Sequence, residues 1–330
     1  MTDRKKDHIE LAFRSQIEKS FVDDRFYYEP FINTHPQKEL KPFNFLGKEI
    51  RTPIWVSSMT GGTKLAGKIN SNLAKACAEF GMGMGLGSCR MLLEDDKYLA
   101  DFDVRHIMGS ELPLYANLGI CQLEELIQNN ELPKISNLVK KLQADGIIIH
   151  VNPMQEWLQP EGDLILRSPI ETIKDLLKHA DYPVIVKEVG QGFGPDSLNQ
   201  LLQLPLQALE FAAFGGTNFA KIEMMRNPDN LIQLYDPLAK IGHTADQMLE
   251  WTNAIVESNR HIKCKELIIS GGIHGFIEGY YLTQKSKLPS IYGQASELLK
   301  YAQGSYSDLQ EYLQTQVEGL KIANAFLRLK

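Results

Sequence analysis

Short apolar runs alternate with longer segments of helical periodicity from residue 53 onward. Runs such as Gly146-Ile147-Ile148-Ile149 are apolar at successive positions, which is typical of parallel strands buried on both faces. The intervening segments, for example residues 69–80, place apolar side chains on one face at helical spacing. We expect strands at residues 54–59, 81–87, 114–117, 146–149, 183–187, 206–213, 267–270 and 290–292. Eight strands alternating with helices predict one α/β domain, a (β/α)8 TIM barrel, rather than a doubly wound sheet.

The first 52 residues precede this repeating pattern. Residues 1–20 predict a short helix, and residues 43–50 predict a strand–turn–strand hairpin that would plug the bottom of the barrel. We therefore expect an N-terminal arm and hairpin at 1–52 and the barrel at 53–330, together forming one structural domain. Long segments at 157–169 and 218–259 predict extended loops or helical inserts after strands four and six. The tail from residue 296 continues with a helical pattern to residue 329.

Composition and charge exclude several classes of partner. With 43% hydrophobic and 23% charged residues the chain is typical of globular proteins, and its net charge of -6 argues against nucleic acid. The charged residues 1–8 are followed by no apolar signal region, and no run of about 18 apolar residues predicts a membrane span. Cys77, Cys89, Cys121 and Cys264 lack metal-binding spacing, so we expect reduced thiols in a cytoplasmic protein.

The expected fourth strand ends in an unusually polar stretch. After three isoleucines come His150, Asn152, Gln155 and Glu156, while Pro153 prevents the strand from continuing. In barrel enzymes the catalytic groups lie at the carboxyl ends of the strands. The stretch therefore predicts part of an active-site rim. The alternative is a capped strand end followed by a solvated turn.

Glycine turns follow strands seven and eight, at Gly271-Gly272 and Gly293-Gln294-Ala295. The loops after these two strands form phosphate sites in many barrels, because glycine lets backbone N–H groups approach the phosphate. This placement favours a phosphate cradle, although glycine also serves ordinary tight turns.

Lys187 ends strand five directly after three apolar residues. A cation at this position suits an electron-rich ring such as a flavin, so the phosphate cradle and Lys187 together suggest bound FMN. Met59-Thr60 and Ala116-Asn117 would then line the flavin ring. Lys187 has two rival roles, as a Schiff-base nucleophile or as the ion-pair partner of Glu188.

Glu156 beside Gln155 suggests a divalent cation. One carboxylate with amides and water is typical of Mg²⁺ held mainly by substrate phosphates, which implies a diphosphate substrate. Arg4-Lys5, His8 and Arg90 would supply further contacts to that anion. The alternative for Glu156 is an ordinary surface charge.

Seven segments in this order resemble the type 2 isopentenyl-diphosphate delta-isomerases, which are FMN-dependent barrel enzymes, over nearly the whole chain. The segments are Arg4-Lys5 with His8, Ser57-Ser58-Met59-Thr60-Gly61-Gly62, Gly85-Leu86-Gly87-Ser88 with Arg90, His150 with Asn152-Pro153 and Gln155-Glu156, Val186-Lys187-Glu188-Val189-Gly190, Gly215-Gly216-Thr217, and Ser270-Gly271-Gly272-Ile273.

The resemblance implies the interconversion of isopentenyl and dimethylallyl diphosphate. It implies catalytic roles for Gln155, His150 and Lys187, with Glu156 directed toward Mg²⁺. It implies substrate contacts from Arg4, Lys5, His8, Arg90, His150, Asn152 and Gln155. It implies an FMN site formed by Met59, Thr60, Gly61, Gly62, Ser88, Asn117, Lys187, Thr217, Gly271, Gly272, Gly293, Gln294 and Ala295.

In this family the flavin must be reduced and is thought to act as the acid–base group. This agrees with the scarcity of strong protein bases at these strand ends, since the amide of Gln155 cannot protonate an alkene. NADPH would be the reductant and would bind only transiently, because the chain has no dinucleotide fingerprint. The resemblance also implies a homotetramer or homo-octamer. Two alternatives are a flavin oxidoreductase of the hydroxyacid or dihydroorotate type, and a phosphate-binding barrel without activity.

Overall fold

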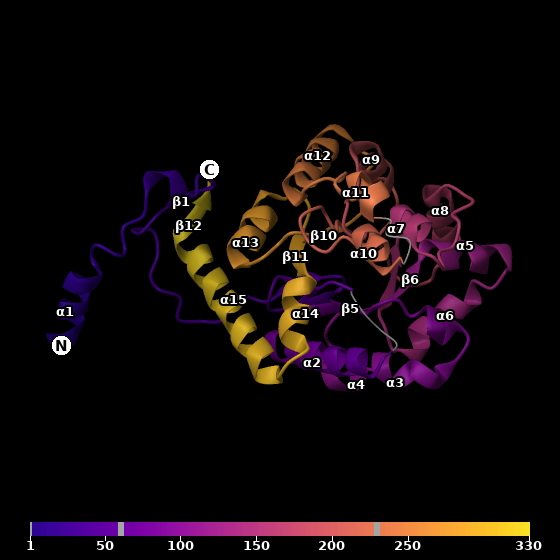
Figure 1. The fold of residues 1–330 in the computed structure, drawn as a ribbon, viewed down its shortest axis with the longest axis horizontal. Helices are drawn as coiled ribbons and strands as arrows, with labels where there is room; N and C mark the ends of the chain where they lie inside the picture. Colours follow the sequence, from indigo (N-terminus) through magenta and orange to yellow (C-terminus); the bar gives the residue numbers. More distant parts are fainter. Residues whose placement is uncertain (1, 59–62, 228–231) are drawn as a thin grey trace.

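A computed structural model describes residues 2–58, 63–227 and 232–330. Eight parallel strands form a closed barrel, which confirms the predicted fold (Figure 1). In order of pairing they are β10 (Glu266–Ser270), β11 (Ser290–Gln294), β4 (Ile54–Val56), β5 (Gly83–Gly85), β6 (Leu114–Gly119), β7 (Gly146–His150), β8 (Val184–Lys187) and β9 (Ala208–Glu210).

Helices connect the strands around the outside of the barrel. They are α2 (Lys64–Phe80), α3 (Leu99–Phe102), α4 (Arg105–Met108), α5 (Ile120–Gln128), α6 (Pro133–Lys141), α7 (Pro153–Leu158), α8 (Pro169–His179), α9 (Pro195–Leu202), α10 (Phe219–Arg226), α11 (Ile232–Ala239), α12 (Ala245–Ser258), α13 (Phe276–Lys285), α14 (Ser296–Ala302) and α15 (Tyr306–Phe326). Two short 3-10 helices, η2 (Arg90–Leu93) and η3 (Asp96–Tyr98), lie between β5 and α3.

Local sequence signals explain several helix ends. The Thr63 side chain accepts a hydrogen bond from the Ala66 N–H at the start of α2, and Gly81 ends the helix in the left-handed conformation. Thr244 and Gln247 form a reciprocal capping box at the start of α12. The long segment after β9 holds α10, α11 and α12, as its length predicted.

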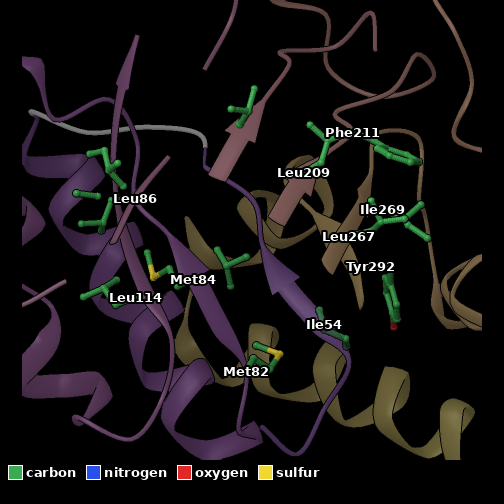
Figure 2. Packing of buried hydrophobic residues seen from close by; sticks show 14 of the residues in the cluster. Ile54, Met82, Met84, Leu86, Leu114, Leu209, Phe211, Leu267, Ile269 and Tyr292 are labelled. Carbon is green, nitrogen blue, oxygen red and sulfur yellow. The ribbon is translucent and has the colours of Figure 1, made fainter. Parts of the chain in front are cut away.

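Seven of the eight barrel strands contribute apolar side chains to two separate layers, because successive side chains point to opposite faces of a strand; β5 has glycine at its inward positions. The outer layer packs between strands and helices, and Figure 2 shows Leu267 and Ile269 of β10 near Tyr292 of β11 within it. The inner layer fills the barrel and contains Trp55, Tyr115, Ile148, Ile185, Ala208, Ile268 and Ile291. Burial of both faces explains the continuous apolar runs in the sequence.

A hairpin of β2 (Phe43–Phe45) and β3 (Lys48–Ile50) plugs the amino-terminal end of the barrel. Phe45, Leu46 and Ile50 belong to the inner apolar layer, and the Leu46 N–H lies 3.1 Å from the carboxylate oxygens of Glu266 at the start of β10. The predicted hairpin and its position are therefore both confirmed.

The chain termini form a pairing that the sequence patterns did not predict. Strand β12 (Leu327–Leu329), where a helix was expected, pairs antiparallel with β1 (Phe26–Tyr28). Helix α1 (Thr2–Leu11) and the 3-10 helix η1 (Lys19–Phe21) precede β1, and α1 lies apart from the barrel (Figure 1). Within the described residues, we find no helix with the length and apolar character needed to cross a membrane.

Candidate active site

The interior of the barrel changes from apolar to polar at the carboxyl ends of six strands. Each polar residue follows an inward apolar residue by two positions, so it points to the same interior face. The apolar and polar pairs are Trp55 and Ser57, Tyr115 and Asn117, Ile148 and His150, Ile185 and Lys187, Ala208 and Glu210, and Ile268 and Ser270. We call the second members of these pairs the polar layer. It lies where barrel enzymes assemble their chemistry.

His150 is fixed by a neighbouring strand. Its Nδ1 lies 2.7 Å from Oδ1 of Asn117 on β6, so an Nδ1–H tautomer would donate to the amide and leave Nε2 unprotonated. Burial, together with the charges of Lys187 and Arg90, lowers the pKa of His150 to about 3. The imidazole is therefore neutral in the ligand-free chain, and the positive charge near it comes from Lys187 and from the exposed Arg90.

Helix α7 begins at Pro153 and brings three polar side chains together. Asn152 Nδ2 donates to Glu156 Oε1 at 2.9 Å and to Gln155 Oε1 at 3.2 Å. The other carboxylate oxygen of Glu156 accepts the Asp163 N–H at 3.0 Å, and the side chain is only 8% exposed. Asn152 Oδ1 is buried with no protein partner. Glu156 is thus a buried carboxylate with a hydrogen bond to each oxygen, so it is not an ordinary surface charge.

Gln155 reaches a second carboxylate that the sequence reasoning missed. Its Nε2 lies 3.4 Å from Oε1 of the buried Glu223 on α10, and Glu223 is paired with Arg226 at 2.5 Å. Arg226 also binds Glu161 in the loop after α7. The helical insert after β9 therefore covers the predicted catalytic amide, and its Glu223 had no motif signal because it lies within an ordinary helical pattern.

Lys187 is 5% exposed, and its Nζ donates to the Glu188 carbonyl oxygen at 2.9 Å. The Glu188 carboxylate instead accepts the backbone N–H groups of Gly190, Gln191 and Gly192 at 2.6–2.8 Å. Burial raises the pKa of Glu188, and these hydrogen bonds oppose the rise. The proposed ion pair between the two side chains is therefore absent from the structure, since Glu188 stabilises the loop after β8.

A pocket opens among the loops that follow β8, β9, β10 and β11. Its lining includes Ser57, Ser58, Lys187, Thr217, Ser270, Gly271, Gly272, Gly293, Gln294 and Ala295. We call it the glycine pocket. Gly271 and Gly272 have positive φ angles of 93° and 73°, which favour glycine. The Ser58 hydroxyl is buried with no protein partner. Exposed backbone together with an unpaired hydroxyl can bind an anionic or carbonyl-rich ligand.

The structure gathers most of the predicted residues at one end of the barrel. Ser88 and Arg90 follow β5, Asn117 lies in β6 beside His150, and Lys187 and Thr217 line the glycine pocket. The Gln294 side chain donates to the Ile273 carbonyl and accepts from the Tyr312 hydroxyl, and its backbone carbonyl accepts the Ser57 N–H at 3.0 Å.

The remaining predicted residues form two groups. Met59, Thr60, Gly61 and Gly62 lie outside the described residues. Arg4, Lys5 and His8 lie on the separate helix α1, and all three are exposed. Their predicted contact with substrate stays a prediction.

The chain is similar over nearly its full length to curated proteins named isopentenyl-diphosphate delta-isomerase. It is 33% identical over 329 residues to that of Rickettsia felis, covering 97% of this chain and 91% of the relative. It is 34% identical over 329 residues to that of Rickettsia africae, covering 97% and 92%. It is 31% identical over 328 residues to that of Rickettsia typhi, with the same coverage of 97% and 92%. No family model matches the chain.

Solved structures share the fold at low sequence identity. A mandelate oxidase variant with a monooxide FMN adduct has a TM-score of 0.59 and 12% identity, covering 93% of this chain and 88% of its own. A flavocytochrome b2 variant with sulfite bound has a TM-score of 0.61 and 12% identity, covering 91% and 72%. These similarities support the barrel fold.

Proposed function

We propose that this chain, which belongs to the isopentenyl-diphosphate delta-isomerase family, interconverts isopentenyl and dimethylallyl diphosphate with reduced FMN and Mg²⁺ at the barrel mouth. The observation that carries the proposal is the network of Asn152, Gln155 and Glu156 at the same end of the barrel as the glycine pocket. The network offers two amides and a buried carboxylate, and His150 nearby adds a neutral imidazole. Among these described residues none is a strong base.

The glycine pocket fits FMN by its chemistry. The unpaired Ser58 hydroxyl and the backbone at Gly271-Gly272 would bind polar edges of the cofactor, and Lys187 supplies a buried positive charge beside it. The proposed contacts also include Ser88, Asn117, Thr217, Gly293, Gln294 and Ala295. Bound in its reduced form, FMN would supply the acid–base chemistry that the amide of Gln155 lacks. NADPH is the proposed reductant.

The diphosphate would bind near His150, Asn152 and Arg90. The ligand-free imidazole is neutral, so an anion at this position would raise the pKa of His150 and favour its protonated form. Gln155 would orient the alkene, since Glu223 fixes its amide from the other side. These groups bind and orient the substrate rather than remove its proton.

Mg²⁺ would depend on the substrate. The described residues contain no group of three or more His, Cys, Asp or Glu side chains able to hold a metal. Glu156 and the unpaired Asn152 Oδ1 offer two oxygen atoms, and the diphosphate would provide the remaining charge. We therefore expect Mg²⁺ to bind with the diphosphate and only weakly without it.

The N-terminal arm is proposed to complete the site of a second copy in a homotetramer or homo-octamer. Its apolar side chains are largely exposed in the single chain, with Phe13 at 82% and Ile17 at 81%. Burial of these side chains against a neighbour would carry Arg4, Lys5 and His8 toward that neighbour's diphosphate.

One experiment separates flavin binding from catalysis. The purified protein with added FMN should show bound oxidised flavin, with absorption at about 450 nm. Gln155→Asn and Glu156→Gln should retain this band and lose at least about 100-fold in isomerisation rate, because both act on the substrate. Lys187→Ala is the matched variant, and it should weaken FMN binding itself. A colourless wild-type protein, or full activity in Glu156→Gln, would contradict the proposal.

A further inference from the structure

Glu210 is a fully buried carboxylate to which the proposed function gives no role. It is 0% exposed and ends β9, inside the polar layer. The hydroxyl of Ser57 donates to its Oε1 at 2.6 Å, and that of Ser270 does so at 3.2 Å. Its Oε2 is buried without a hydrogen bond of good geometry, and the buried Trp55 side chain also acts to lower the pKa of Glu210. Burying a carboxylate costs considerable free energy unless neighbouring groups compensate its charge.

The surroundings of Glu210 are built to hold a carboxylate at this level. Gly293 leaves room for the two donors, since a Cβ there would approach Ser57 Oγ at 2.5 Å and Ser270 Cβ at 2.7 Å. Ser270 Oγ also accepts the Ala212 N–H at 2.9 Å, which orients its hydroxyl proton toward Glu210. Residues from three strands and a glycine thus place one carboxylate beneath the floor of the pocket.

Lys187 is the cation nearest to Glu210 in the barrel register. The two residues are partners across β8 and β9, and both point inward. They form no direct salt bridge, because Lys187 Nζ donates to the Glu188 carbonyl oxygen. Burial raises the pKa of Glu210, and the Lys187 charge and the two serine hydroxyls oppose this rise. The Glu210 carboxylate therefore acts on Lys187 electrostatically and not through a hydrogen bond, and the Lys187 side chain still lines the pocket.

We propose that Glu210 is the buried counterion of Lys187 and a positioning residue that limits how strongly this lysine stabilises reduced FMN. The inference rests on the proposed function, because it assumes flavin in the glycine pocket. A negative charge on reduced flavin gains energy from Lys187, and a second negative charge below the lysine offsets part of this gain. Glu210 thereby lowers the reduction potential of the bound flavin.

The test is the midpoint potential of FMN bound to the full-length protein, measured spectroelectrochemically. Glu210→Gln keeps the shape and removes the charge, so reduced FMN should bind about tenfold more tightly relative to oxidised FMN. For a two-electron couple this is a rise of about 30 mV. Ser57→Ala, which removes the shorter hydroxyl bond and favours a protonated Glu210, should shift the potential in the same direction by a smaller factor. This variant keeps the test valid should Glu210→Gln not fold.

A second comparison asks whether Glu210 acts through Lys187. In a Lys187→Met protein the buried carboxylate loses its cation and should take up a proton, so adding Glu210→Gln should change the potential little. Glu266→Gln, which neutralises a carboxylate at the opposite end of the barrel, is the control and should leave the potential unchanged.

Three results would overturn the inference while leaving the proposed function intact. The first is an unchanged midpoint potential in flavin-loaded Glu210→Gln, or in Ser57→Ala if Glu210→Gln does not fold. The second is an equal effect of Glu210→Gln on the potential with and without Lys187. The third is an equal shift of the potential in the control Glu266→Gln. A wild-type protein that binds no FMN would instead refute the proposed function, and the inference with it.

Discussion

At the scale of single residues, the site separates charges from neutral polar groups. Lys187 and Arg90 are cations near the barrel mouth, while His150 between them is neutral because burial and these charges lower its pKa to about 3. The imidazole can therefore respond to an incoming anion by gaining a proton. This low pKa also makes the stability of the fold depend on pH.

The stability of the ligand-free protein should fall as the pH drops from about 6.5 toward 3. In this window the unfolded chain protonates His150 and the folded chain does not, so the unfolded state binds more protons and stability rises with pH. His150→Asn should remove this pH dependence, which lowers the free energy of unfolding of the wild-type protein by about 3 kcal/mol at pH 4. Urea unfolding of both proteins between pH 4 and 7 measures it. Parallel stability curves for the two proteins would show that His150 is protonated in the fold.

At the same scale, sequence patterns predicted the residues with motif signals and missed those without. His150, Lys187 and the three residues Asn152, Gln155 and Glu156 were predicted because polar residues follow apolar runs at strand ends. Glu210 lies inside the expected strand 206–213, where a single carboxylate between apolar neighbours gave no sign of its two serine donors. Its partners come from distant strands, and only the closed barrel brings them together.

At the scale of elements, the loops after β9 and β10 depend on each other. A Cβ at Gly271 would overlap the backbone of Ala213, and one at Gly272 would approach Gly215 Cα at 3.1 Å. Both glycines also have positive φ angles. The pocket floor is therefore shaped by backbone contact between two loops, which only glycine permits at these positions.

Gly271→Ala should abolish FMN binding and lower the free energy of unfolding by about 3 kcal/mol, since it combines left-handed strain with overlap against the loop after β9. Gly47→Ala is the matched control, because Gly47, in the turn between β2 and β3, has a φ of 78° but no atom within 4 Å of the position that an added Cβ would take. It should cost only about 1 kcal/mol and leave the flavin band unchanged. Thermal unfolding and FMN titration of both variants check this. Equal losses in the two variants would refute the contact argument.

The elements themselves were predicted to different extents. The barrel strands and the hairpin at 43–50 carry strong local patterns, and their positions are confirmed. The pairing of β1 with β12 joins the two ends of the chain, and a three-residue strand in an aromatic segment has no local periodicity that identifies it. Residues 327–329 instead continued the helical pattern of α15.

At the scale of the whole molecule, the chain combines a closed barrel with an arm that lies apart from it (Figure 1). The arm carries exposed apolar side chains and the predicted substrate contacts Arg4, Lys5 and His8. Such a surface favours association between copies. In our proposal, substrate binding therefore requires assembly of several copies, whereas FMN binds within one chain.

Removal of residues 1–22 should reduce the assembly size and raise the KM for isopentenyl diphosphate at least about tenfold, while FMN affinity stays the same. The Arg4→Ala/Lys5→Ala double variant should raise the KM without changing the assembly, because the apolar side chains remain. Light scattering and steady-state kinetics distinguish the two effects. A truncated protein with unchanged KM would exclude the arm from the site.

The most direct test of the central claim is the conversion of isopentenyl diphosphate to dimethylallyl diphosphate by the purified protein under anaerobic conditions, followed by NMR. We predict conversion with FMN, NADPH and Mg²⁺ together, and at least about a 100-fold lower rate when either FMN or Mg²⁺ is omitted. Undiminished conversion by flavin-free protein, or net reduction of the flavin by the substrate without NADPH, would contradict the account.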